Sequence, residues 1–287
     1  MTNRPPTAEN SNALYRGMDR EALDAAYNIS AAVVGSAEIV AGWREASAEV
    51  RARPDAQLDT SYGPRPRMAF DYFPCGVPNA PLFVFIHGGY WQRNDKNGFS
   101  IFALGALANG IDVAVVGYTL APEVHLGIIV SEISASLDYL GANAGDYGFD
   151  PSRIFVGGWS AGGHLTAMTL DHPQVRGGLA ISGIFDLEPI ALSYLDEPLS
   201  LTEEQVSDLS PIRLIGARLA PVRVVVGGEE LSELRRQSED YTAAADSAGM
   251  RASLRMAQGR NHFTMLEELR EPEGGLTRDL VSLIDSD

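Results

Sequence analysis

The 287-residue sequence has only one cysteine, Cys75, so the chain cannot form an internal disulfide bond. This cysteine usage is typical of a reducing compartment. No apolar run approaches the roughly 20 residues that a helix needs to cross a bilayer. Residues 1–12 are polar and rich in proline, and they lack the apolar core of a signal peptide. We therefore expect a cytoplasmic protein without a membrane partner.

Basic residues are also scarce, because 22 lysines and arginines stand against 38 aspartates and glutamates, for a formal net charge of −16. Such a surface is a poor partner for nucleic acids and anionic membranes. The histidines are scattered and no His-Glu-x-x-His motif is present, so we predict no metal and no cofactor. The expected partner is a small-molecule substrate, and the sequence leaves a homodimer open.

Internal repeats and low-complexity tracts are absent, and the length suits one α/β unit or at most two. Strand and helix patterns alternate from about Met68 to the end, which favours one continuous sheet in residues 68–287. Residues 1–67 are predicted to form a helical extension on this core. One helix would begin at Asp19 as its cap, and a second would cover residues 39–51 with Trp43 on its apolar side.

A short motif follows the apolar run Ile154-Phe155-Val156, namely Gly158-Trp159-Ser160-Ala161-Gly162. Gly-x-Ser-x-Gly after a strand is typical of the nucleophile elbow of an α/β-hydrolase, in which a sharp strand-to-helix turn exposes one serine hydroxyl. Side chains two positions before and after the serine would collide, so glycine occupies both. An ordinary glycine-rich turn is the alternative. The motif predicts an α/β-hydrolase fold, a mostly parallel central sheet flanked by helices, with Ser160 as nucleophile.

A second motif, His87-Gly88-Gly89-Tyr90-Trp91, follows the run Leu82-Phe83-Val84-Phe85-Ile86, which we expect to be a fully buried strand. In this fold the loop after the third strand and the residue after the nucleophile supply amide donors for the substrate oxygen. We therefore expect the amides of Gly88 or Gly89 and of Ala161 to form an oxyanion hole. A tight turn without chemistry is the alternative, and two such loops in this order disfavour it.

His262 is the candidate base, because it lies in the loop after the expected last strand, residues 252–256. Its position also meets the chain order of serine, acid and histidine in this fold. The other histidines are expected to shape the oxyanion loop, to point away on the helix after the serine, or to lie in connecting segments: His87, His164, His125 and His172.

The acid is expected after the penultimate strand, residues 222–226, where Gly227-Gly228 leads into Glu229 and Glu230. One of these glutamates would hold the imidazole in the correct tautomer and stabilise its cationic form. Spacing alone does not choose between the two neighbours. Asp186, which follows the preceding strand, is a third candidate, and helix capping is its alternative role.

These motifs, together with Asn261-His262-Phe263, resemble the kynurenine formamidase (arylformamidase) group of α/β-hydrolases, which is close to the esterases related to hormone-sensitive lipase. His-Gly-Gly-Tyr-Trp is the most specific piece, and the resemblance covers nearly the whole chain. In that group the acid is an aspartate in a segment like Val-Gly-x-x-Asp-Ser. The resemblance places Glu230 there, so the longer side chain must fold back or the loop must shift. Leu231 replaces the serine that follows the acid.

The resemblance also implies that the N-terminal helices fold over the pocket mouth, although they would alternatively only cover a sheet edge. The insertion at residues 184–215 is expected to form another wall, because loops at the carboxyl edge of a sheet carry specificity. Tyr90, Trp91 and Trp159 flank the proposed site and would contact a flat or apolar substrate group, unless they only pack beneath the loops. No basic cluster demands an anionic substrate, although Arg93 is near the site in sequence.

We therefore predict a serine hydrolase that cleaves a small aryl formamide or a carboxylic ester through an acyl-enzyme. Ser160 would attack the carbonyl carbon, His262 would transfer the proton, and Glu230 would orient His262. The resemblance makes N-formylkynurenine the natural candidate substrate. Two alternatives stay open, namely a general short-chain carboxylesterase and a non-catalytic relative that only binds a ligand.

Overall fold

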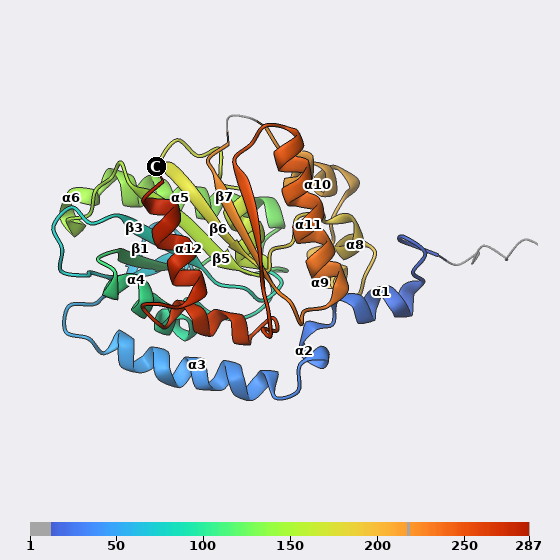
Figure 1. The fold of residues 1–287 in the computed structure, drawn as a ribbon, viewed down its shortest axis with the longest axis horizontal. Coiled ribbons are helices and arrows are strands. Elements are labelled where there is room, and N and C mark those ends of the chain that lie inside the picture. The colour runs from blue at the N-terminus through green and yellow to red at the C-terminus, as the bar shows by residue number, and fades with distance from the viewer. Residues whose placement is uncertain (1–12, 217–218, 287) are drawn as a thin grey trace, which may run out of the picture.

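The computed structural model describes residues 13–216 and 219–286, so residues 1–12, on which the expectation of no signal peptide rests, lie outside the described part. An eight-stranded sheet runs through the molecule in the order β1-β2-β4-β3-β5-β6-β7-β8 (Figure 1). β2 pairs antiparallel with β1 and β4, and all other pairs are parallel. The strands are β1 (Gln57–Ser61), β2 (Ala69–Phe73), β3 (Leu82–Ile86), β4 (Asp112–Val116), β5 (Ile154–Trp159), β6 (Val175–Ile181), β7 (Val222–Gly227) and β8 (Ala252–Ala257).

The central strands form from short apolar runs because a parallel sheet with helices on both faces buries its strands on both sides. Every residue of β3, β4 and β5 is buried. β3 coincides with the predicted buried strand, and β5, β7 and β8 contain the other predicted runs. The predicted α/β-hydrolase fold, a mostly parallel sheet flanked by helices, is therefore confirmed.

Right-handed crossovers place the helices on the two faces of the sheet. The step from β3 to β4 runs one way along the sheet and the step from β4 to β5 runs the other, so α4 and α5 cover opposite faces. α12 contacts α4, β6 and β7, and it lies in front of the strands in Figure 1. The α-helices are α1 (Arg20–Tyr27), α2 (Ile29–Ala32), α3 (Ser36–Arg51), α4 (Leu104–Ala108), α5 (Leu126–Ala142), α6 (Ala144–Tyr147), α7 (Ala161–Ala167), α8 (Glu188–Ala191), α9 (Asp196–Leu199), α10 (Glu203–Asp208), α11 (Ser232–Ser247) and α12 (Gly275–Ile284). The 3-10 helices are η1 (Lys96–Gly98), η2 (Ser100–Ala103), η3 (Pro211–Arg213) and η4 (Thr264–Leu269).

β1 lies before Met68, within the segment that the sequence assigned to the helical extension, so the sheet begins earlier than expected. A charge cluster holds this exposed edge strand in place. Asp71 on β2 is fully buried and pairs with Arg51 at 2.6 Å and with Lys96 at 2.5 Å. The same carboxylate accepts the backbone N–H of Asp59 on β1 at 2.9 Å. The division of the chain at residue 67 stays a prediction.

Both predicted N-terminal helices are present. The side chain of Asp19 accepts the N–H of Ala22 at 3.0 Å, which satisfies a free amide in the first turn of α1. α3 runs along one side of the molecule (Figure 1) and buries Trp43, whose ring lies 5.0 Å from that of Phe102 and 5.6 Å from that of Trp159. The extension is therefore packed firmly on the core.

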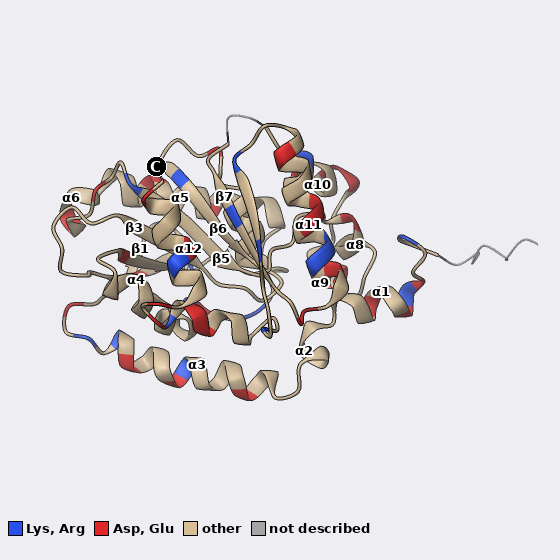
Figure 2. Cartoon of the chain, viewed as in Figure 1, with Lys and Arg blue, Asp and Glu red and all other residues tan. Residues whose placement is uncertain are grey.

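Acidic side chains are spread over many surface elements, and Lys and Arg are fewer (Figure 2). Within residues 13–216 and 219–286, none of the helices combines the length and the hydrophobicity of a transmembrane span. Over the same ranges, no three His, Cys, Asp or Glu side chains are grouped so that they could hold a metal ion. Cys75 is half-buried in a loop, and burial raises the pKa of its thiol to about 11, so it is a poor nucleophile at neutral pH.

Candidate active site

Ser160 lies in the tight turn between β5 and α7. Its φ of 60° and ψ of −116° are uncommon for a residue other than glycine, and it is almost fully buried. A Cβ atom built on Gly162 would lie 2.0 Å from the carbonyl oxygen of Ile86, so only glycine fits at this position. The turn therefore has the strained geometry of a nucleophile elbow.

The loop after β3 approaches the serine closely. A Cβ atom built on Gly88 would lie 2.9 Å from the Cβ atom of Ser160, so glycine permits the approach. Tyr90, Trp91 and Asn94 in the same loop have φ values of 51°, 60° and 75°. Left-handed conformations cost energy in such residues and cluster at functional sites, which supports a functional role for this loop.

Two side chains fix the orientation of the peptide between Gly88 and Gly89. The carbonyl oxygen of Gly88 accepts a hydrogen bond from Nδ2 of Asn94 at 3.0 Å and lies 2.9 Å from Nδ1 of His87. Burial lowers the pKa of His87 to about 4, so the ring is neutral and donates from Nδ1. In a trans peptide the N–H points away from the preceding carbonyl. The amide of Gly89, which lines a cavity with Ser160, therefore points away from Asn94.

His262 lies in the loop after β8 and lines the same cavity as Ser160. Its Nδ1 is 2.6 Å from Oε2 of Glu230, which directs Nε2 away from the carboxylate. The other oxygen of Glu230 accepts the hydroxyl of Ser182 at 2.5 Å and the backbone N–H of Gly227 at 2.7 Å. The glutamate side chain thus folds back over its own turn. This is one of the two alternative adjustments that the sequence analysis gave for the longer side chain.

The other two acid candidates have different surroundings. Glu229 is exposed to solvent. Asp186 accepts hydrogen bonds from the hydroxyl of Tyr15 at 3.0 Å and from the backbone N–H of Glu188 at 3.1 Å. Of the three candidates, Glu230 is therefore the one that the structure joins to His262.

The remaining histidines do not reach the serine. His164 is fully buried, its Nε2 lies 2.8 Å from the carbonyl oxygen of Leu209, and burial lowers its pKa to about 4. Nε2 of His172 lies 3.3 Å from the carboxylate of Asp138. His125 is exposed at the start of α5. Their surroundings agree with the roles that the sequence analysis gave them.

A cavity of about 100 Å³ lies at Ser160 and His262, and its walls are largely aromatic and apolar. Tyr90 and Trp159, which the sequence proposes as substrate contacts, both line it. Nε1 of Trp159 also donates to the carbonyl oxygen of His262 at 2.8 Å, which holds the histidine loop. The lining residues are Ile29, Ser30, Val40, Gly89, Tyr90, Arg93, Asn94, Trp159, Ser160, Tyr194, His262 and Phe263.

Trp91, the third proposed substrate contact, does not line this cavity. It is fully buried, and its ring lies edge-on to that of His164 with centroids 4.9 Å apart. The structure therefore places Trp91 beneath the loop, in the packing role that was the alternative for these aromatic residues.

Both segments that were expected to wall the pocket do so. Ile29 on α2 and Val40 on α3 line the cavity, so the N-terminal helices do more than cover a sheet edge. Tyr194 comes from the insertion between β6 and β7, and its backbone N–H donates to Asp24 on α1 at 2.7 Å. The extension and the insertion are thus tied to each other at the pocket.

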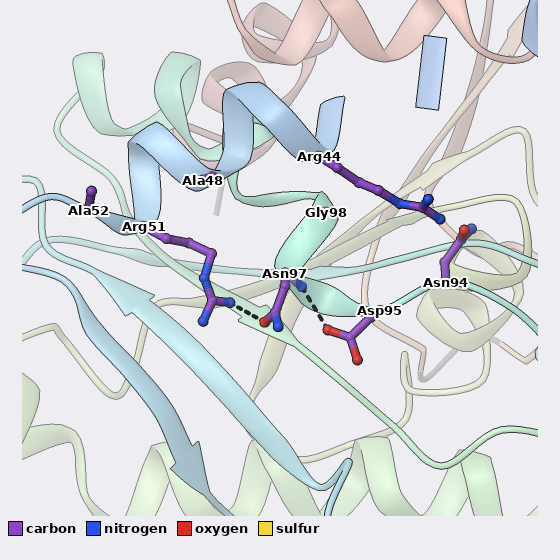
Figure 3. Close-up of a pocket in the computed structure, with 8 residues that line it drawn as sticks. All are labelled: Arg44, Ala48, Arg51, Ala52, Asn94, Asp95, Asn97 and Gly98. Atoms are coloured by element: carbon purple, nitrogen blue, oxygen red, sulfur yellow. Dashed lines mark hydrogen bonds between the residues drawn. The ribbon is translucent and has the colours of Figure 1, made fainter. Parts of the chain in front are cut away.

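A second cavity, of about 750 Å³, opens between α3 and the loop that leads into η1 (Figure 3). Asn94 lines both cavities, so the two adjoin at this residue. The side chain of Arg51 donates to that of Asn97 across this groove. The groove residues are Arg44, Ala48, Arg51, Ala52, Asn94, Asp95, Asn97 and Gly98.

The motifs did not point to Asn94 or Ser182. A signal for Ser182 was available, because it directly follows β6 and so lies at the carboxyl edge of the sheet beside Glu230. Asn94 gave no comparable signal, since a loop asparagine is common and its bond to Gly88 depends on how the loop folds.

Comparison with known proteins agrees with this geometry. The BD-FAE family profile matches residues 72–174. The kynurenine formamidase of Danio rerio is 32% identical to this chain over 251 residues, which are 82% of this chain and 84% of that protein. The kynurenine formamidase of Salmo salar is 30% identical, over 85% of this chain and 87% of that protein.

Solved structures give the same result. A protein from Silicibacter sp. TM1040 that is assigned as a thioesterase has a TM-score of 0.81 at 34% identity, over 89% of this chain and 97% of that one. The esterase of Pyrobaculum calidifontis shares the fold, with a TM-score of 0.72 at 20% identity, over 87% of this chain and 91% of that one. The chain therefore belongs to the kynurenine formamidase family of α/β-hydrolases and is a hydrolase that acts on ester or formamide bonds.

Proposed function

We propose that this hydrolase removes the formyl group of an aryl formamide, with N-formylkynurenine as the candidate substrate. The observation that carries the proposal is the 2.6 Å contact between His262 and Glu230 beside Ser160 in one small cavity. A serine hydroxyl is a weak nucleophile, and an oriented histidine is the group that activates it.

The reaction follows from this arrangement. The hydroxyl oxygen of Ser160 attacks the formyl carbon while Nε2 of His262 takes the proton. Glu230 stabilises the imidazolium that forms. The C–N bond then breaks, and His262 returns the proton to the nitrogen of the leaving arylamine. Water, deprotonated by His262, attacks the formyl-serine ester and releases formate.

The negative charge on the tetrahedral intermediate needs backbone donors. We assign this role to the amides of Gly89 and Ala161, with that of Gly88 as the alternative in the loop after β3. Two observations support Gly89: it lines the cavity, and the carbonyl of Gly88 is already turned towards Asn94. The position of Ala161 also supports the assignment. It is the first residue of α7, and the amides of a helix's first turn have no intrahelical partners.

The size and walls of the cavity support a small acyl group on an aromatic leaving group. A volume of about 100 Å³ accommodates formyl or acetyl better than a long chain. Tyr90, Trp159 and Phe263 supply flat apolar surface for an aryl ring. Both kynurenine formamidases named above cover more than four-fifths of this chain.

The test is parallel turnover of N-formylkynurenine and p-nitrophenyl acetate by the purified full chain. We expect kcat/KM for deformylation at least comparable to that for the ester. Efficient ester cleavage with no deformylation would overturn the formamidase proposal in favour of a short-chain carboxylesterase, which the same triad serves. No turnover of either compound would leave the ligand-binding alternative.

The proposal also includes a cytoplasmic location, and it leaves a homodimer open. The single cysteine, Cys75, supports the reducing compartment. The homodimer has no comparable support, and the molecular mass in solution tests it.

A further inference from the structure

Two arginines at the proposed active site have no carboxylate partner. Arg93 lines the cavity with Ser160, and Arg44 lines the adjoining groove. Among residues 13–216 and 219–286, neither makes an ion pair. The neighbouring cations differ, because Arg51 pairs with Asp59 and Asp71 and Arg67 pairs with Asp95 at 3.3 Å. In a chain with a net charge of −16, these two guanidinium groups place positive charge beside one site that no neighbouring carboxylate neutralises by a direct ion pair.

Each arginine lines one of the two cavities, and Asn94 lines both. In Figure 3 the side chain of Arg44 extends from α3 towards that of Asn94. Arg93 precedes Asn94 in the chain and lies on the side of the catalytic cavity. A substrate that leaves the small cavity past Asn94 would therefore pass between two positive charges.

One face of α3 connects the two cavities. Val40 lines the catalytic cavity, while Arg44 and Ala48 line the groove. These residues are four positions apart, so they lie above one another on the same side of the helix. The groove thus continues the catalytic cavity along α3, and Arg44 stands at the transition between them.

We propose that Arg93 and Arg44 form a subsite for a carboxylate carried by the leaving group of the substrate. The proposal rests on the proposed function, whose candidate substrate carries such a carboxylate, and it assigns the recognition of that group to these two residues. It also revises the expectation from the sequence that no basic cluster favours an anionic substrate.

The chemistry of the two residues supports this choice of ligand. The planar guanidinium matches the two oxygens of a carboxylate and forms paired hydrogen bonds with it. The charge of Arg93 is felt inside the pocket: burial raises the pKa of Tyr194, and Arg93 acts against this rise. The overall negative field of the protein disfavours an anion, so local cations are required for one to bind.

The experiment compares matched substrates that differ in one carboxylate. For the formamide reaction they are 4-(2-formamidophenyl)-4-oxobutanoate, which is N-formylkynurenine without its ammonium group, and the corresponding neutral primary amide. For the ester reaction they are 4-acetoxybenzoate and its methyl ester. We expect Arg93→Gln and Arg44→Gln each to lower kcat/KM for the carboxylate member about three- to tenfold, mainly through KM, because the sites are solvent-exposed. The neutral member should change less than twofold.

Arg251→Gln is the matched control, because Arg251 is equally exposed but precedes β8 at the opposite, amino-terminal edge of the sheet. It should change neither member of a pair. Raising the salt concentration should reduce the preference for the carboxylate in the parent protein and not in the double variant. A preference in either single variant that equals that of the parent, or an equal loss for both members, overturns the subsite. The ester pair keeps this result separate from failure of the formamidase proposal, since it requires only ester cleavage.

Discussion

The side-chain amide of Asn94 donates a 3.0 Å hydrogen bond to the carbonyl oxygen of Gly88. This bond holds the peptide whose N–H belongs to Gly89, so Asn94 would position the proposed oxyanion donor without contacting the reacting atoms. Asn94→Asp keeps the shape but sets a carboxylate against the carbonyl oxygen. We expect kcat to fall roughly tenfold to a hundredfold with little change in KM, since one misplaced oxyanion donor costs up to about a thousandfold.

Asn94→Gly separates the hydrogen bond from the backbone requirement. Glycine accepts the φ of 75° at no cost, so this variant loses only the amide. Its kcat should lie between those of the parent and Asn94→Asp, with an unchanged unfolding temperature. Parent-like kcat in both variants would show that the bond does not position the loop.

The nucleophile is tested by Ser160→Ala. Removal of the hydroxyl abolishes the covalent route, and kcat should fall roughly a thousandfold or more. A fluorophosphonate probe should label Ser160 in the parent protein, and peptide mass spectrometry locates the label. Labelling of a different serine, or full activity of the variant, would contradict the assignment.

The acid is tested by Glu230→Gln, which keeps the size of the side chain and removes its charge. The imidazolium of His262 then loses its stabilising partner, and kcat should fall by about a thousandfold or more. Glu229→Gln is the control, because this neighbour is exposed, and it should be close to the parent. Asp186→Asn should mainly lower thermal stability, because it removes the charge that binds Tyr15.

These three variants are compared by kcat/KM, with the unfolding temperature of each as a check on folding. If Glu229→Gln or Asp186→Asn is the inactive one while Glu230→Gln works, the 2.6 Å contact with His262 does not serve catalysis.

Much of this site is readable from the sequence because a parallel α/β sheet gathers the carboxyl ends of its strands at one edge. The serine and the loop with Gly88 and Gly89 each follow an apolar run directly, and His262 lies in the loop after β8, so strand order brings them to one edge. The choice of Glu230 as the acid could not be made from strand order alone, because Glu229 is its neighbour in the same loop. The backbone N–H of Gly227 and the hydroxyl of Ser182 hold its carboxylate, and these contacts exist only in the folded chain.

Three features that the sequence did not predict each have their own physical reason. β1 is an exposed edge strand without an apolar run, so no burial pattern marks it. Trp91 belongs to the motif of the loop after β3, but its ring packs against His164 beneath that loop. The left-handed φ of 60° at Trp91 is part of the loop's turn, which the sequence pattern does not reveal. Arg93 and Arg44 are separated in sequence, and they line adjoining cavities only because α3 packs against η1.

The neutral, buried His164 makes stability depend on pH. Its pKa is about 4 in the folded protein and about 6.5 in an unfolded chain, so between these values the unfolded state binds the additional proton. The stability that the neutral His164 contributes is therefore fully present above pH 6.5 and is lost as the pH falls towards 4. Each such histidine contributes a slope of up to about 1.4 kcal/mol per pH unit to the free energy of unfolding.

His164→Gln and His164→Phe both remove this titration. His164 itself does not belong to the proposed catalytic group. Both variants lose stability at pH 7.5, because Nε2 of His164 no longer pairs with the carbonyl oxygen of Leu209, although glutamine retains an N–H donor. Between pH 7 and 5, however, their free energies of unfolding should fall less steeply than that of the parent, by up to about 1.4 kcal/mol per pH unit. Urea unfolding at several pH values measures the slope. Because the two replacements differ in size and polarity, an equal flattening identifies the lost proton as the cause, whereas parent-like slopes in both would mean that His164 is not held neutral by burial.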